Sequence, residues 1–154
     1  MNRALEQFAS DIGLEESEHV RLRLAFGYAC IQRVEHLLEE PEVVNCLRVL
    51  GEYVNHIVDE ARFQQAQKDA DRLANRHRGS KSIDGCGHAA VSASYAVANA
   101  INGKALQAAS YAAYATVYAA GGYGAVADAE AFESEFRWQL NTLRELARQM
   151  QSRA

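Results

Sequence analysis

Two alanine-dense stretches, separated by glycine-containing breaks, constrain this chain more than any other feature. They run from about Gly85 to Ile101 and from about Lys104 to Ala120. The breaks are Asn102-Gly103 and Gly121-Gly122-Tyr123-Gly124. Alanine has the highest helix propensity, and glycine commonly ends helices. We therefore predict two helices that pack closely, because small side chains let helix axes approach.

The rest of the chain also follows the helix period. There is one proline, Pro41, which suits the first turn of a helix, and there are few alternating runs of the kind typical of strands. Further helices are predicted at about 2–10, 17–38, 41–58, 60–77 and 129–149, with a bend near Asp59 and a loop at 78–82. The buried stripe predicted for the last helix is Phe132, Phe136, Leu140, Leu143, Ala147 and Met150.

Length and charge limit the class of protein. A chain of 154 residues has the usual size of one domain, so we predict a single all-α domain over 1–154, an irregular helical bundle of about seven helices. The net charge of -4 argues against a general nucleic-acid binder and mildly favours a basic partner. No apolar run reaches the length of a membrane span, and the first residues do not resemble a signal peptide. A cytoplasmic location is expected.

The histidines and cysteines show no metal-ligand spacing. None of the five histidines, His19, His36, His56, His77 and His88, forms an H-E-x-x-H pattern or an i, i+4 pair. Cys30, Cys46 and Cys86 include no C-x-x-C pair and are interpreted as small packing residues. Cys86 and His88 open a predicted helix, where a thiolate or an anion would be favoured, but no base for Cys86 is identifiable. We predict no catalytic residue, no metal and no cofactor.

The aromatic residues of the second half allow two interpretations. Tyr95, Tyr111, Tyr114 and Tyr118 could line a small-molecule groove or fill gaps between alanine-rich helices, and core packing is the favoured alternative. Trp138, the single tryptophan, could anchor an interface or lie buried between helices.

Charge is unevenly distributed along the middle of the chain. Acidic residues dominate from 35 to 60, whereas basic residues dominate from 62 to 81. An acidic face can steer association with a basic protein surface, but it can also be a solvated helix face paired internally with the basic segment. Both alternatives remain open from the sequence. The candidate partner-binding residues are Glu35, Glu39, Glu40, Glu42, Glu52 and Asp59.

Several short motifs occur in a familiar order. These are Gln32-Arg33-Val34, an acidic turn at Pro41, Gly87-His88-Ala89-Ala90, Ala112-Ala113-Tyr114-Ala115 and Glu135-Phe136-Arg137-Trp138-Gln139. Over roughly residues 20–146 the chain resembles the all-helical immunity proteins of bacterial polymorphic toxin systems. The resemblance implies a protein that binds and blocks a cognate toxin domain without turnover. Arg33, His88 and Trp138 match the family pattern as pocket-forming or structural positions.

Two classes of function are thus predicted. The first is an immunity protein whose partner is a cognate toxin domain, with no nucleic acid and no membrane involved. The alternative is a helical small-ligand-binding or adaptor module, in which Tyr111, Tyr114 and His88 line a pocket between the alanine-rich helices.

Overall fold

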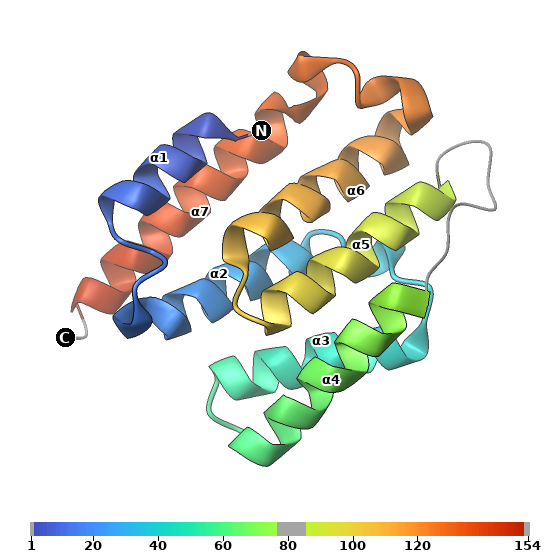
Figure 1. The fold of residues 1–154 in the computed structure, drawn as a ribbon. Helices are drawn as coiled ribbons and strands as arrows, with labels where there is room; N and C mark the ends of the chain where they lie inside the picture. The colour runs from blue at the N-terminus through green and yellow to red at the C-terminus, as the bar shows by residue number, and fades with distance from the viewer. Residues whose placement is uncertain (1, 77–85, 153–154) are drawn as a thin grey trace.

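The computed structural model describes residues 2–76 and 86–152 (Figure 1). These residues form seven α-helices, three short 3-10 helices and no strand, so the predicted all-α class is confirmed. The predicted loop at 78–82 and His77 lie outside the described residues. The α-helices are α1 (Arg3–Asp11), α2 (Val20–Gln32), α3 (Pro41–Val54), α4 (Glu60–Arg76), α5 (Cys86–Ile101), α6 (Ala105–Ala125) and α7 (Glu133–Ser152); the 3-10 helices are η1 (Ser17–His19), η2 (Glu35–Leu37) and η3 (Ala129–Phe132).

Helix α2 is the centre of the bundle. It contacts α3, α5, α6 and α7, while α1 packs on α7 and α4 packs on α3 and α5. Figure 1 shows the α1–α7 pair on one side of the molecule, the α3–α4 hairpin on the other, and the α5–α6 pair between them. Among the described helices none is long and apolar enough to cross a lipid bilayer.

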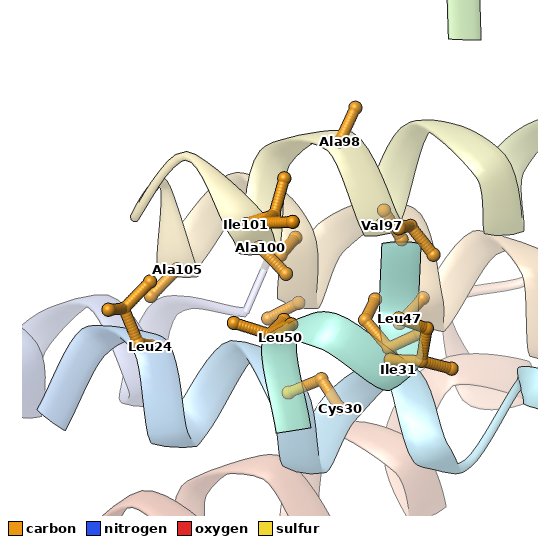
Figure 2. Packing of buried hydrophobic residues seen from close by; sticks show 14 of the residues in the cluster. Leu24, Cys30, Ile31, Leu47, Leu50, Val97, Ala98, Ala100, Ile101 and Ala105 are labelled. Atoms are coloured by element: carbon orange, nitrogen blue, oxygen red, sulfur yellow. The ribbon is translucent and has the colours of Figure 1, made fainter. Parts of the chain in front are cut away.

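The core forms where α2, α3 and α5 meet. Buried residues occur almost all around α2, as expected for an internal helix. Figure 2 shows side chains of these three helices in contact. Those labelled in the picture include Leu24 and Ile31 of α2, Leu47 and Leu50 of α3, and Val97 and Ile101 of α5.

Small residues determine how closely the helices approach. Alanines at 105, 108, 109, 112 and 115 of α6 are almost fully buried. At the crossing of α2 and α5, a Cβ atom added to Gly27 would lie 3.0 Å from the Cβ and 3.2 Å from the Cα of Ala100. Because that space is filled by backbone, α2 and α5 depend on glycine at this position.

Several predicted boundaries are confirmed, but the helix predicted at 17–38 is wrong at both ends, since α2 covers only Val20–Gln32 and the short 3-10 helices η1 and η2 lie on either side of it. The predicted break near Asp59 is present, since α3 ends at Val54 and α4 begins at Glu60. The predicted break at 121–124 is present as a kink at Gly122, where the backbone is not helical, although α6 as a whole continues to Ala125. Gly122 absorbs the change of direction with φ 69° and ψ -159°, a conformation that glycine adopts without steric cost.

We expect Gly27→Val to lower the free energy of unfolding by about 1–3 kcal/mol, because the added methyl groups overpack the contact with Ala100. The matched control is Gly124→Val, since no heavy atom lies within 4 Å of a Cβ at Gly124. The control should change stability by no more than about 0.5 kcal/mol. Urea denaturation followed by circular dichroism measures both, and equal losses would show that α2 and α5 are not held in this close contact.

Candidate functional site

A buried ion pair joins the end of α2 to the start of α7. The guanidinium of Arg33 donates to both carboxylate oxygens of Glu135, with Nε–Oε1 at 2.9 Å and Nη2–Oε2 at 2.8 Å. The Glu135 side chain is only 4% exposed, whereas that of Arg33 is 39% exposed. The hydrogen bond to Glu135 raises the pKa of Arg33. Arg33 is also the C-cap of α2, where a positive charge favours the helix dipole.

Trp138 completes this contact. The guanidinium carbon of Arg33 lies 4.2 Å from the centroid of the Trp138 ring, within range of a cation–π interaction. The ring is half-buried and packs against the core, as the favoured interpretation of burial between helices predicted in part. Arg33 and Trp138, two of the three residues that the sequence analysis proposed as pocket-forming or structural, are therefore brought together, and the third, His88, lies elsewhere.

The buried stripe predicted for the last helix is wrong in part. Glu135 and Gln139 are more deeply buried than Phe136 and Leu140, which are only half-buried. Gln139 donates from Nε2 to the carbonyl of Ala109 at 2.8 Å and accepts from Asn2 at 3.3 Å. Positions 135 and 139 continue the helical spacing of Phe132, Leu143 and Ala147. The occurrence of two polar residues at the helical spacing of a buried stripe could have been used to predict these contacts from the sequence.

The tyrosines of α6 correct another expectation. Core packing was favoured for four tyrosines, and Tyr95 does pack against the core, but Tyr111 and Tyr114 are 38% and 40% exposed. The reason is that α6 turns its alanines towards the core, which places the tyrosines on the outer face. Tyr95 stacks on Tyr111 at 5.4 Å between ring centroids, and Tyr114 lies 6.3 Å from Tyr118.

His88 lies at the first turn of α5 and is half-buried. Its ring stacks on Tyr118 of α6, with centroids 5.3 Å apart and an interplanar angle of 26°. The structure therefore places His88 with the outer row of tyrosines, as the pocket interpretation required. It does not place His88 beside Arg33 or Trp138.

The six predicted partner-binding acids do not form one continuous patch. Glu35, Glu39, Glu40 and Glu42 lie within eight positions of the sequence, from η2 to the first turn of α3, and we name these four the α3 entry cluster. Glu52 and Asp59 lie at the far end of α3, about 15 Å away along the helix axis. Glu52 pairs with Arg48 at 2.8 Å, and Asp59 accepts from the backbone N–H of Arg62, the first turn of α4.

Within the described part of the basic segment, up to residue 76, one ion pair with the α3 entry cluster is present. The Nη2 atom of Arg72 lies 3.6 Å from Glu42, and both side chains are more than half exposed. Such exposed pairs are worth about 0–1 kcal/mol. Glu35 and Glu39 are exposed. The cluster therefore presents negative charge to solvent, and the weak pair at Glu42 does not prevent it from meeting a partner.

The sequence analysis did not identify one group of acidic and histidine side chains that the structure brings together. Ligand atoms of Glu16, Glu18 and His19 all lie within 4.8 Å of one another on η1. Nδ1 of His19 lies 2.7 Å from the carbonyl oxygen of Gly13, and Arg23 donates to the carbonyls of Leu14 and Glu16. These contacts hold the connection between α1 and α2 in place, so His19 has a structural role there.

Cys30 and Cys46 are free and buried, as the packing interpretation predicted. Burial is the main cause that raises the pKa of both thiols, to about 11 in Cys46. The negative charge of Glu135 raises that of Cys30 further. Neither thiol is ionised near neutral pH. The side chain of Cys86 is not among those described.

Comparison of the chain with family models, with curated proteins and with solved structures finds no match. The functional argument therefore rests on the surfaces and contacts of this chain itself.

We expect Arg33→Met to lower the free energy of unfolding by about 2–3 kcal/mol, because it leaves the carboxylate of Glu135 buried without a cation. Breaking a fully buried pair costs about 3–5 kcal/mol, and partial exposure of Arg33 reduces the loss. Arg137→Met, at an exposed arginine of α7, the helix that carries Glu135, should change the free energy of unfolding very little. In urea denaturation, Arg33→Met/Glu135→Gln should lose less than the sum of the single losses. If the losses in free energy of unfolding were additive, Arg33 and Glu135 would not be interacting, which would contradict the ion pair.

Thiol accessibility tests the burial of Cys30 and Cys46. In a Cys86→Ser background, we expect native protein at pH 8 to show no thiol that reacts rapidly with a disulfide reagent, since only the thiolate is nucleophilic and both pKa values are raised by burial. Two thiols should react once urea is added. Rapid reaction of either thiol in the native state would contradict the packing.

Proposed function

We propose that this protein is an immunity protein that binds a cognate bacterial toxin domain and neutralises it by covering its surface, without turnover or a cofactor. The observation that supports this most is the α3 entry cluster, four acidic residues within eight positions at one end of α3. Three of them, Glu35, Glu39 and Glu42, are exposed. Negative charge concentrated in this way accelerates association with a basic protein surface.

The location of the cluster at a helix N-terminus explains why these charges can be kept together. Glu40 is the N-cap residue of α3 and Glu42 lies in its first turn, where the helix dipole favours negative charge. The dipole of α3 therefore offsets part of the repulsion between these carboxylates. No partner is needed to hold the surface in shape, which suits a protein that must bind a toxin rapidly.

A second candidate function is the ligand-binding or adaptor module. The specific observation in its favour is the exposure of Tyr111 and Tyr114 on the outer face of α6. Exposed tyrosines offer large, rigid contact area and a hydroxyl group at low cost in side-chain entropy. Native mass spectrometry of the purified protein would detect a small molecule retained under these rings.

The test of the immunity proposal is co-expression with the toxin domain encoded beside this chain. We expect rescue of growth and a stable complex on co-purification. No adjacent toxin domain, or one whose toxicity is unaffected, would overturn the proposal.

Charge reversal locates the contact. We expect Glu39→Lys/Glu42→Lys to slow association with the toxin domain about tenfold at low salt and to flatten its salt dependence, because steering by exposed charges is screened by ions. A control of equal charge is Glu6→Lys/Glu15→Lys, at exposed glutamates in α1 and in the α1–α2 connection. Stopped-flow kinetics measures the rates. Equal effects of the two double variants would attribute steering to net charge and exclude the α3 entry cluster as the contact.

A further inference from the structure

A cleft opens beside the outer end of α6. It encloses about 260 Å³ and is lined mainly by aromatic and small apolar side chains. The lining residues used below are Ser110 and Tyr114 of α6, Ala129 and Phe132 of η3, and Phe136 of α7. We name this hollow the aromatic cleft.

The rings of the aromatic cleft form walls at an angle to one another. Tyr114 and Phe132 have centroids 5.3 Å apart and an interplanar angle of 76°, and Phe136 lies 5.3 Å from Phe132 at 32°. Phe132 is packed against Ala113 and Val117, so its ring is held in place. Tyr114 is 40% exposed and lies at the opening. Tyr114 and Phe132 touch edge to face, so together they form a rigid corner of the cleft.

The polypeptide around the cleft is acidic. The segment from Val126 to Glu133 contributes four residues to the lining and carries Asp128, Glu130 and Glu133, all exposed, with no basic residue. One oxygen of Asp128 caps the backbone N–H of Glu130 at 3.0 Å. The next base along the chain is the exposed Arg137. A cluster of acids alone would not define a site, but here it adjoins a hollow with aromatic walls.

We propose that the aromatic cleft binds an organic cation, an alkylammonium or guanidinium group. The faces of aromatic rings carry negative potential and attract such cations, more strongly where water is excluded. Exposed carboxylates raise the local concentration of cations. The hydroxyl groups of Ser110 and Tyr114 are the polar side-chain groups of the lining, and neither supplies the positive charge that an anion needs. The inference deepens the second candidate function and rests on it.

The probe is choline, and its matched control is 3,3-dimethyl-1-butanol, which has the same shape without charge. Titration of the full chain is followed by NMR of the aromatic side chains. We expect choline to shift the resonances of Tyr114, Phe132 and Phe136, and to bind about tenfold more tightly than the neutral alcohol. Equal affinity for the two compounds would show a simple apolar hollow and would overturn the proposal, and so would shifts confined to Tyr95 and Tyr111.

Two exposed tyrosines provide matched variants. Tyr114→Leu removes a wall of the cleft and should weaken choline binding at least fivefold. Tyr111→Leu changes a tyrosine of similar exposure that stacks on Tyr95 and does not line the cleft, so choline affinity should be unchanged. Circular dichroism checks that both variants are folded. Unchanged choline affinity in Tyr114→Leu would overturn the proposal.

A second probe identifies the source of the cation. Acetyl-arginine amide represents a side chain of a bound protein, whereas choline represents a free small molecule. Tighter binding of the arginine derivative would assign the cleft to a basic partner protein, and tighter binding of choline to a metabolite; either result supports cation binding. Native mass spectrometry tests the second candidate function without choline, so a retained molecule that is not a cation would contradict this inference and leave that function intact.

Discussion

The contact between α2 and α5 at Gly27 and Ala100 determines the geometry of the bundle. Helix α2 contacts four other helices, and at this crossing only the methyl group of Ala100 lies between the two backbones. The alanines of α5 and α6 then allow that pair to pack closely beside α2. Larger residues from α2 and α3, such as Phe26 and Leu50, supply the volume that alanine cannot.

Polar side chains determine how α7 packs on its neighbours, because the small residues of those helices provide little apolar contact. Alanine buries little apolar area, so each alanine-rich helix gains less from burial than a leucine-rich one. The buried carboxamide of Gln139 and the carboxylate of Glu135 give α7 a specific register against α6 and α2. A polar contact inside a core has few alternative positions in which its hydrogen bonds are all satisfied.

Sequence reasoning identified the helices because their signals are local. Pro41, Gly103 and the alanine runs determine where helices begin and end, and each acts within a few residues. The buried face of α7 was predicted only in part, because Glu135 is buried with its charge paired to Arg33, which lies 102 positions away in the sequence. The exposure of Tyr111 and Tyr114 was missed for a similar reason, since alanine and tyrosine alternate around α6 and only its neighbours decide which face is covered.

The candidate site could also be predicted only in part, because contacts between residues far apart in the sequence determine it. The acidic segment was recognisable from composition, but its division into an entry cluster and two distant acids follows from the length of α3. The aromatic cleft depends on Tyr114, Phe132 and Phe136, which come from three elements. The glycine run at 121–124 predicted a break between them, but the direction that the chain takes after the kink at Gly122 depends on the elements that it packs against.

The stacking of Arg33 on Trp138 also gives the protein an internal optical reporter. Because Trp138 is the only tryptophan, its emission arises from one place, the joint between the end of α2 and the start of α7. A nearby guanidinium and partial burial both influence the excited state of an indole ring. Fluorescence from this chain therefore follows the integrity of a single joint between the central helix and the C-terminal one, separately from the helix content that circular dichroism averages over the whole fold.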